Sequence, residues 1–178
     1  MTTYLAFLRA INLGAKRVFP KDDIRAAVEA AGFDNAATHI NTGNVRFDTR
    51  LRSRAKIEEA LERAFQMDRG FEVPTIAFSA TEFAAVAAEG VALDAAHPGL
   101  ARHYVYFLKE PLEDDQVAAV EGTASTHGQM VVRDRAAHAL LNPGYQDGVV
   151  DPLRAAKLLG VTTSRAMTVV TALAAKWC

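Results

Sequence analysis

The polar residues with the best placement for chemistry lie near the start of this 178-residue sequence, directly after a predicted apolar strand. Arg9 and Lys16 supply two cations, Asn12 supplies a carboxamide, and Gly14 lets the backbone turn. The segment leads into a predicted helix at Pro20, and the N-terminus of a helix attracts anions. These residues therefore form a candidate site for a phosphate or carboxylate. The alternative is a solvated loop in which Asn12 and Gly14 only shape a turn.

A second polar group lies in the segment that runs from His39 to Asn44, between two predicted strands. Asn and Gly tolerate the positive φ that a short hairpin connection needs, and Gly43 stands inside the turn. Asn41 and Asn44 flank the turn with amides that donate and accept, and His39 adds a titratable ring. The alternative is structural, since these amides can also satisfy backbone groups of the turn and of the neighbouring loop.

The predicted strand order brings the two polar groups to one surface, because the hairpin strands lie beside the first strand in a split βαβ unit. Arg9 follows a covered strand, so we expect its guanidinium to be held in place and to be the charge that matters most. Lys16 adds charge from a more flexible stem.

Other groups of residues give weaker indications of a functional site. A basic run over residues 46–56 lacks the stacking aromatic residues of an RNA-binding sheet, and the net charge is −1, so we expect no nucleic-acid partner. His97 and His103 show no metal-ligand spacing, so no metal site is expected. Without a GxxxxGK[ST], GxGxxG or GxSxG motif, no cofactor is expected and no catalytic residue is identified.

Composition bounds the class of protein. Half of the residues are hydrophobic, which is enough for a packed core. The one cysteine, Cys178, allows no disulfide within the chain, so we expect a cytoplasmic location. The sequence begins without a signal-peptide pattern and contains no apolar run long enough to cross a bilayer, so no membrane partner is expected.

Hydrophobic periodicity predicts an α+β protein of two αβ subdomains. Residues 1–79 form the first, in the order strand, helix, strand, strand, helix, strand, which is the ferredoxin-like arrangement. Residues 80–178 form a smaller related half that ends in a C-terminal helix. Its predicted strands are 103–108, 129–133 and 137–141, and its predicted helices start after the capping box 79–82, at 111, at 151 and after 164.

Two segments of the first half resemble a family of uncharacterised bacterial proteins, DUF1697. The opening Tyr-Leu-Ala-Phe-Leu-Arg-Ala-Ile-Asn-Leu-Gly-Ala at 4–15 and the hairpin Thr-His-Ile-Asn-Thr-Gly-Asn-Val-Arg-Phe at 38–47 carry the resemblance. Ala10 and Ala15 stand where the family pattern has glycine, which makes this loop stiffer. Near the end, Arg165, Thr168 and Val169 match the family pattern, whereas its Trp and Asn are missing. The resemblance implies the two-part α+β fold and no activity.

Three functions remain open at this point. The first is the binding of a small anionic ligand at the loop and turn, through Arg9, Asn12, Gly14, Lys16, His39, Asn41, Gly43 and Asn44. The second is an enzyme that acts on a phosphorylated or carboxylated small molecule, with His39 as the acid–base group. The third is a structural or homo-oligomeric module whose polar turns only shape the fold.

Overall fold

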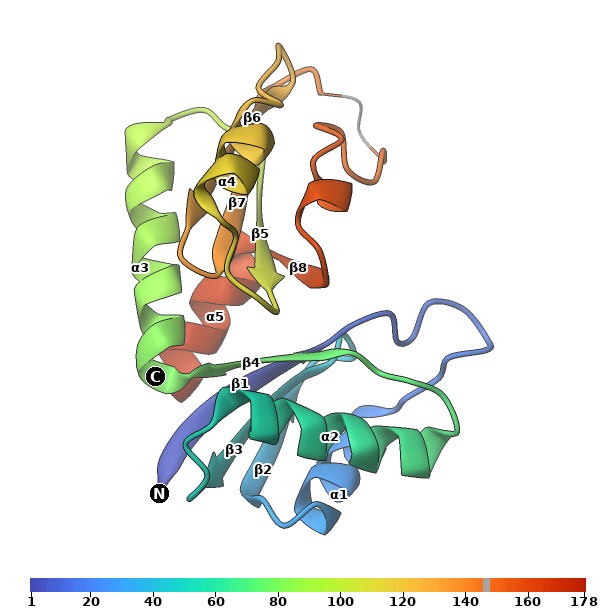
Figure 1. Cartoon of the computed structure of the whole chain (residues 1–178). Coiled ribbons are helices and arrows are strands. Elements are labelled where there is room, and N and C mark those ends of the chain that lie inside the picture. The colour runs from blue at the N-terminus through green and yellow to red at the C-terminus, as the bar shows by residue number, and fades with distance from the viewer. Residues whose placement is uncertain (146–147) are drawn as a thin grey trace. The chain divides into compact units, whose positions relative to one another are not determined.

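The computed structural model describes residues 1–145 and 148–178, and these residues form two compact units. The first unit contains residues 1–83 and 176–178, and the second contains residues 84–175 (Figure 1). Each unit holds a four-stranded antiparallel sheet with helices, so the predicted α+β class is confirmed. Within the described residues, no helix is both long and apolar enough to cross a membrane.

The first unit has the predicted ferredoxin-like order of elements. Its sheet has the strand order β2-β3-β1-β4, and all neighbouring strands are antiparallel. The elements are β1 (Thr2–Leu8), α1 (Lys21–Ala30), β2 (Asp34–His39), β3 (Asn44–Thr49), α2 (Arg54–Arg69) and β4 (Thr75–Ser79).

Strand β1 is buried on both of its faces because its side chains are apolar on both. Tyr4, Ala6 and Leu8 belong to the core under α1 and α2. On the opposite face, Phe7 contacts Phe78 and Phe83, with ring centroids 6.2 and 5.3 Å apart respectively. A strand that is covered on both faces and paired along both edges anchors whatever follows it in the chain.

The second unit repeats this topology, with the strand order β6-β7-β5-β8. Its core on one face of the sheet includes Val120 of the short helix and Leu159. The elements are α3 (Ala80–Ala96, which starts in the first unit), β5 (Arg102–Leu108), α4 (Asp114–Glu121), β6 (Gly128–Arg133), β7 (Ala136–Leu141), the 3₁₀ turn η1 (Ala156–Leu158), β8 (Thr162–Ala166) and α5 (Met167–Trp177).

Two elements of the second unit differ from the sequence prediction. The helix predicted from residue 151 is only the 3₁₀ turn η1, because Asp151 and Arg154 take left-handed φ values of 63° and 56°. The Asp151 carboxylate accepts the N–H groups of Ala155 and Ala156 at the start of η1. The segment predicted as a lead into the last helix is strand β8, which completes the sheet beside β5.

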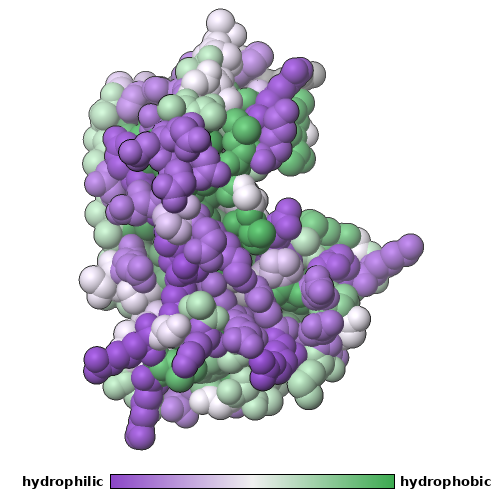
Figure 2. Space-filling view, viewed as in Figure 1, coloured by the Kyte–Doolittle hydropathy of each residue, from purple (hydrophilic) through white to green (hydrophobic). Residues whose placement is uncertain are grey.

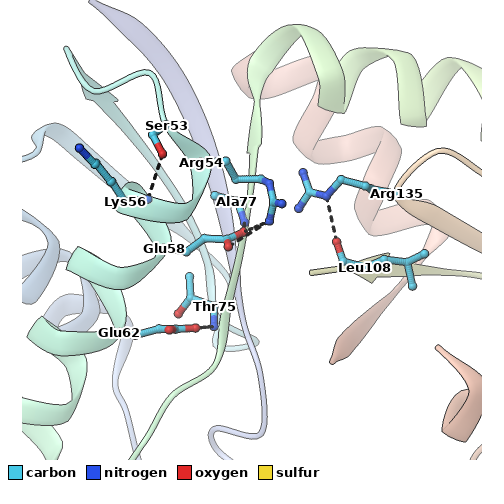
Figure 3. Close-up of polar contacts among 9 residues, drawn as sticks. All are labelled: Ser53, Arg54, Lys56, Glu58, Glu62, Thr75, Ala77, Leu108 and Arg135. Carbon is cyan, nitrogen blue, oxygen red and sulfur yellow. Dashed lines mark hydrogen bonds and ion pairs between the residues drawn. The ribbon is translucent and has the colours of Figure 1, made fainter. Parts of the chain in front are cut away.

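Glutamates of the helices bind backbone N–H groups on one edge strand of each sheet. Glu58 and Glu62 of α2 accept the backbone N–H groups of Ala77 and Thr75 on the edge strand β4, at 2.9 and 2.8 Å (Figure 3). Glu121 does the same for an N–H group of the edge strand β6, at 3.0 Å. Unpaired strand edges invite pairing with other chains, so these carboxylates protect the edges as well as satisfy buried donors.

The outer side of α2 is polar. Its exposed residues include Lys56, Glu59 and Arg63, and hydrophilic side chains dominate the part of the first unit that faces the viewer in Figure 2. The helix is bounded by Ser53, whose hydroxyl accepts the N–H of Lys56, and by Gly70 at a left-handed φ of 76°.

A substitution of Glu58 tests how much its hydrogen bond to the N–H of Ala77 on β4 stabilises the fold. We expect Glu58→Ala to lower the free energy of unfolding by about 1–3 kcal/mol, because it leaves a buried N–H without its acceptor. The matched control is Glu59→Ala, which removes only an exposed ion pair with Arg63 and should cost less than about 0.5 kcal/mol. Urea denaturation measures both. Equal midpoints for the two variants would contradict this role of Glu58.

Candidate functional site

Asn12 fixes the loop that follows β1. Its amide N–H groups donate to the carbonyl oxygens of Phe19 and Asn41, at 3.0 and 2.9 Å, and its amide oxygen accepts the N–H of Phe19 at 2.8 Å. The backbone N–H of Asn12 donates to the carbonyl of Arg17 at 2.8 Å. One side chain therefore ties the loop to itself and to the hairpin turn.

The hairpin turn docks directly on the end of β1 (Figure 1). The N–H of Leu8 donates to the carbonyl of Gly43 at 2.8 Å. Gly43 has a φ of 77°, and a Cβ atom there would lie 2.8 Å from the Cβ of Leu8 and 3.0 Å from Cδ1 of Ile11. Both the backbone conformation and this close approach require glycine.

Two polar residues of the hairpin, Asn44 and His39, are turned toward the interior. Asn44 is 1% exposed, and its amide donates to the carbonyl of His39 and to the hydroxyl of Thr42, at 3.0 and 2.8 Å. The ring of His39 is half-buried and packs edge-on against Trp177, with ring centroids 6.1 Å apart. The Asn44 amide therefore stabilises the turn, as the structural alternative requires.

Arg17, and not Arg9, holds the loop after β1 in place. Arg9, which we expected to be held, is exposed, and its backbone N–H donates to the carbonyl of Pro74. Arg17 holds the loop instead. Its guanidinium donates to the carbonyls of Ala10 and Glu72, at 2.6 and 2.5 Å, and lies 4.6 Å from the centre of the Phe71 ring.

Seven of the eight predicted site residues therefore separate into two sets, and the eighth, His39, packs against Trp177. Asn12, Gly43 and Asn44 build the junction of loop and turn. Arg9, Gly14, Lys16 and Asn41 lie exposed on or beside it. The loop carries backbone strain as well, because Ala10 and Asn12 adopt left-handed φ values of 57° and 54°.

A second polar cluster lies in the second unit, and the sequence did not assign it. Nδ1 of His103 on β5 lies 2.7 Å from Oδ1 of Asp94 on α3, and its Nε2 lies 2.9 Å from Nδ1 of His138 on β7. His138 is fully buried, and its Nε2 has no hydrogen-bond partner among the described residues. The three side chains form a line, and the described part of the chain holds no group of three or more such residues arranged for a metal ion.

The chemistry of the three groups fixes the positions of the protons. An ionised carboxylate only accepts, so Nδ1 of His103 must carry the proton that Asp94 receives. Burial, and then the charges of His103 and Arg133, lower the pKa of His138 from 6.5 to about 4, although Asp94 opposes this. His138 is therefore neutral at pH 7 and shares a single proton with the Nε2 of His103.

One feature of the sequence marks this cluster. His138 is the only polar residue of the strand Ala136-Ala137-His138-Ala139-Leu140-Leu141, in which all six residues are buried. A polar side chain inside an otherwise apolar strand needs a partner. Neither Asp94 nor the pairing of His103 with His138 can be found from spacing, because the three residues come from different elements.

Comparisons with known proteins place the fold and assign no ligand. A family model described as "Protein of unknown function (DUF1697)" matches residues 1–138, which confirms the resemblance found in the sequence. No curated protein matches the sequence. Among solved structures, the conserved bacterial protein SP0830 from Streptococcus pneumoniae is similar, with a TM-score of 0.73 and 21% identity. The match covers 99% of this chain and 98% of that chain, and at this identity it establishes the fold alone.

The left-handed backbone at Ala10 predicts a stabilising substitution. We expect Ala10→Gly to raise the free energy of unfolding by about 0.5–1 kcal/mol, since the relief of the left-handed strain exceeds the added entropy of the unfolded chain. Ala15→Gly is the matched control, because the φ of Ala15 is not positive. It should lower the free energy of unfolding by about 0.4–1 kcal/mol. Urea midpoints that shift in the same direction for both variants would refute the explanation.

The burial of neutral His138 predicts that the free energy of unfolding decreases at acidic pH. The pKa in the folded state is below that of the unfolded chain, so the unfolded state binds more protons between pH 6.5 and 4. The contribution of His138 to the free energy of unfolding is therefore fully present above pH 6.5, and about 3 kcal/mol of it is lost as the pH decreases toward 4.

Urea denaturation at several pH values measures this loss. The variant His138→Leu should lose stability less steeply on acidification than the wild type. His127→Leu, at an exposed histidine, should keep the wild-type slope. An unchanged slope in His138→Leu would show that another group causes the acid sensitivity.

Proposed function

Because the chain belongs to the DUF1697 family of proteins of unknown function, we propose its function from the geometry of the loop after β1. The chain is a cytoplasmic protein that binds a small molecule through a phosphate or carboxylate group. The site is the exposed surface of the loop and of the adjoining β2–β3 turn.

One observation carries the proposal: two cations without partners stand on a loop that is held rigidly. In the part of the chain that the structure describes, the side chains of Arg9 and Lys16 make no hydrogen bond or ion pair. The backbone beneath them is fixed by Asn12 and by Arg17. A preorganised backbone lowers the entropic cost of binding, and unpaired cations keep their donors available for an anion.

The ligand contacts in this proposal differ from those first expected. The amides of Asn12 and Asn44 are occupied by the backbone of the loop and turn, so they position the site and do not contact the anion. Arg9 and Lys16 supply the charge, and the exposed Asn41 supplies a neutral donor beside them. The guanidinium matches a carboxylate or phosphate in a bidentate geometry, which makes Arg9 the principal contact.

Substitution of the two cations tests the proposal. Thermal-shift titrations with phosphate, sulfate, nucleotides and small carboxylates identify the anion that raises the melting temperature of the wild type. Arg9→Gln should then weaken binding at least about tenfold, since a charge-assisted hydrogen bond contributes about 1.5–3 kcal/mol. Lys16→Gln should weaken it less.

The melting temperature without ligand should stay unchanged in Arg9→Gln, because that side chain is exposed. The matched control is Arg25→Gln, at an exposed arginine of α1, which should bind as the wild type does. The proposal fails if no anion stabilises the wild type, or if Arg9→Gln retains full affinity.

A further inference from the structure

We propose that the second unit contains a separate binding site for a small zwitterion of the α-amino-acid class. The site is a cavity of about 560 Å³ at the end of α3, beside the start of β5 and the start of α5. The ammonium group of the ligand binds Asp94 and His97, and its acid group binds toward Arg102 and Thr168, all of which line the cavity.

Asp94 provides the anionic wall. The Asp94 side chain is 47% exposed, and its Oδ1 is held by the Nδ1–H group of His103 at 2.7 Å. The second carboxylate oxygen has lone pairs available to the cavity. His103 itself is 4% exposed in its side chain, and both of its ring nitrogens are engaged, by Asp94 and by His138. His103 is therefore a positioning residue that orients the carboxylate, and Asp94 is the group that meets the ligand.

His97 adds a second acceptor on the same wall. Its Nδ1 lies 3.0 Å from the carbonyl oxygen of Leu93, so Nδ1 carries the proton and Nε2 is left with a free lone pair when the ring is neutral. His97 follows Asp94 by three residues, just past the C-terminal end of α3, where the helix dipole also favours a cation. Two acceptors and the negative end of a helix together suit an ammonium group.

The opposite charge also belongs to the lining of the cavity. Arg102 is exposed, and one of its guanidinium nitrogens donates to the carbonyl of Ala101 at 2.9 Å, which leaves other N–H groups for a ligand. Thr168 stands in the first turn of α5, where the helix dipole is positive. A cavity lined both by acceptors and by a cation fits a ligand that carries both charges better than a simple amine or a simple acid.

The buried histidine pair is a second, independent indication of function. Among the residues that the structure describes, the buried Nε2 of His138 has no partner, an arrangement that costs free energy and that an apolar residue would avoid. A role in holding Asp94 beside the cavity explains this cost, since functional groups require supporting hydrogen bonds. Met167 and Leu100 give the cavity apolar surface for the remainder of a ligand, and its volume falls in the range of about 300–1,000 Å³ that is usual for small-molecule sites.

This site does not depend on the anion site of the first unit, because the two share no residue. Phosphate binding by Arg9 and amino-acid binding by Asp94 can therefore fail or succeed separately.

Histidine NMR spectra test the proposal directly. Each protein amino acid is titrated to millimolar concentration, and the ring signals of His97 and His103 are followed in the intact protein. We expect saturable shifts of these signals with at least one amino acid, and unchanged signals for the exposed His127. The 2-hydroxy acid and the amine that each lack one charged group of that amino acid should bind at least about tenfold more weakly, because each loses one charged contact.

Three variants assign the contacts. Asp94→Asn should weaken binding at least about tenfold, and Arg102→Gln, at an exposed residue that leaves the histidine cluster intact, should weaken it as well. Asp114→Asn, at an exposed aspartate of α4 outside the cavity, is the matched control and should leave binding unchanged. The proposal is overturned if no amino acid gives a saturable shift, if the hydroxy acid or the amine binds equally well, or if Arg102→Gln and folded Asp94→Asn bind as the wild type does.

Discussion

The burial of strand β1 on both faces and along both edges is the constraint on which the first unit depends. Five consecutive residues from Tyr4 to Leu8 are at most 7% exposed. The strand pairs with β3 on one side and with β4 on the other, so its backbone has no freedom to shift. Burial of this kind contributes roughly 1.5–3 kcal/mol for each large apolar side chain. The end of β1 is therefore a fixed point in the molecule.

The polar groups of the loop after β1 and of the β2–β3 turn are arranged around the end of β1. The chain leaves β1 through residues with left-handed backbone conformations, and the hairpin turn closes on Leu8 through Gly43. Side-chain amides and Arg17 satisfy the backbone groups that this irregular path would otherwise leave without partners. The polar groups that remain exposed, above all Arg9, are those that the loop does not use for itself. That division is the physical basis for expecting a ligand there.

The second unit uses the same sheet topology with a different polar content. Its central strand β5 and the adjacent β7 carry His103 and His138 toward each other, whereas the other face of the sheet packs an apolar core against α4 and η1. A line of three hydrogen-bonded side chains from Asp94 into the interior is a costly feature in a small sheet. It places a half-exposed carboxylate at a cavity in a fixed orientation. The two units thus share a sheet topology but differ in their polar surfaces, since the first presents the cations Arg9 and Lys16 and the second presents the carboxylate of Asp94.

The sequence by itself determined the order of the elements in the first unit, because alternation and helical periodicity depend only on which side chains avoid water. In the second unit it missed strand β8 and predicted a helix where the structure has only the turn η1. It determined the ferredoxin-like first unit and located the loop and turn through their Asn and Gly residues. It also contained a visible signal at His138, a polar residue within an apolar strand. These properties are local, and local spacing is what a sequence displays.

Only the tertiary structure decided which polar groups are occupied. Arg9 and Arg17 have the same side chain and stand eight residues apart, yet Arg17 holds the carbonyls of Ala10 and Glu72 whereas Arg9 is exposed. The partner of His103 lies 35 residues away on another strand. A side chain's partners are set by the packing of elements distant in sequence, and its charge, protonation and availability for a ligand follow from those partners. For that reason the sequence identified candidate residues, and the fold assigned their roles.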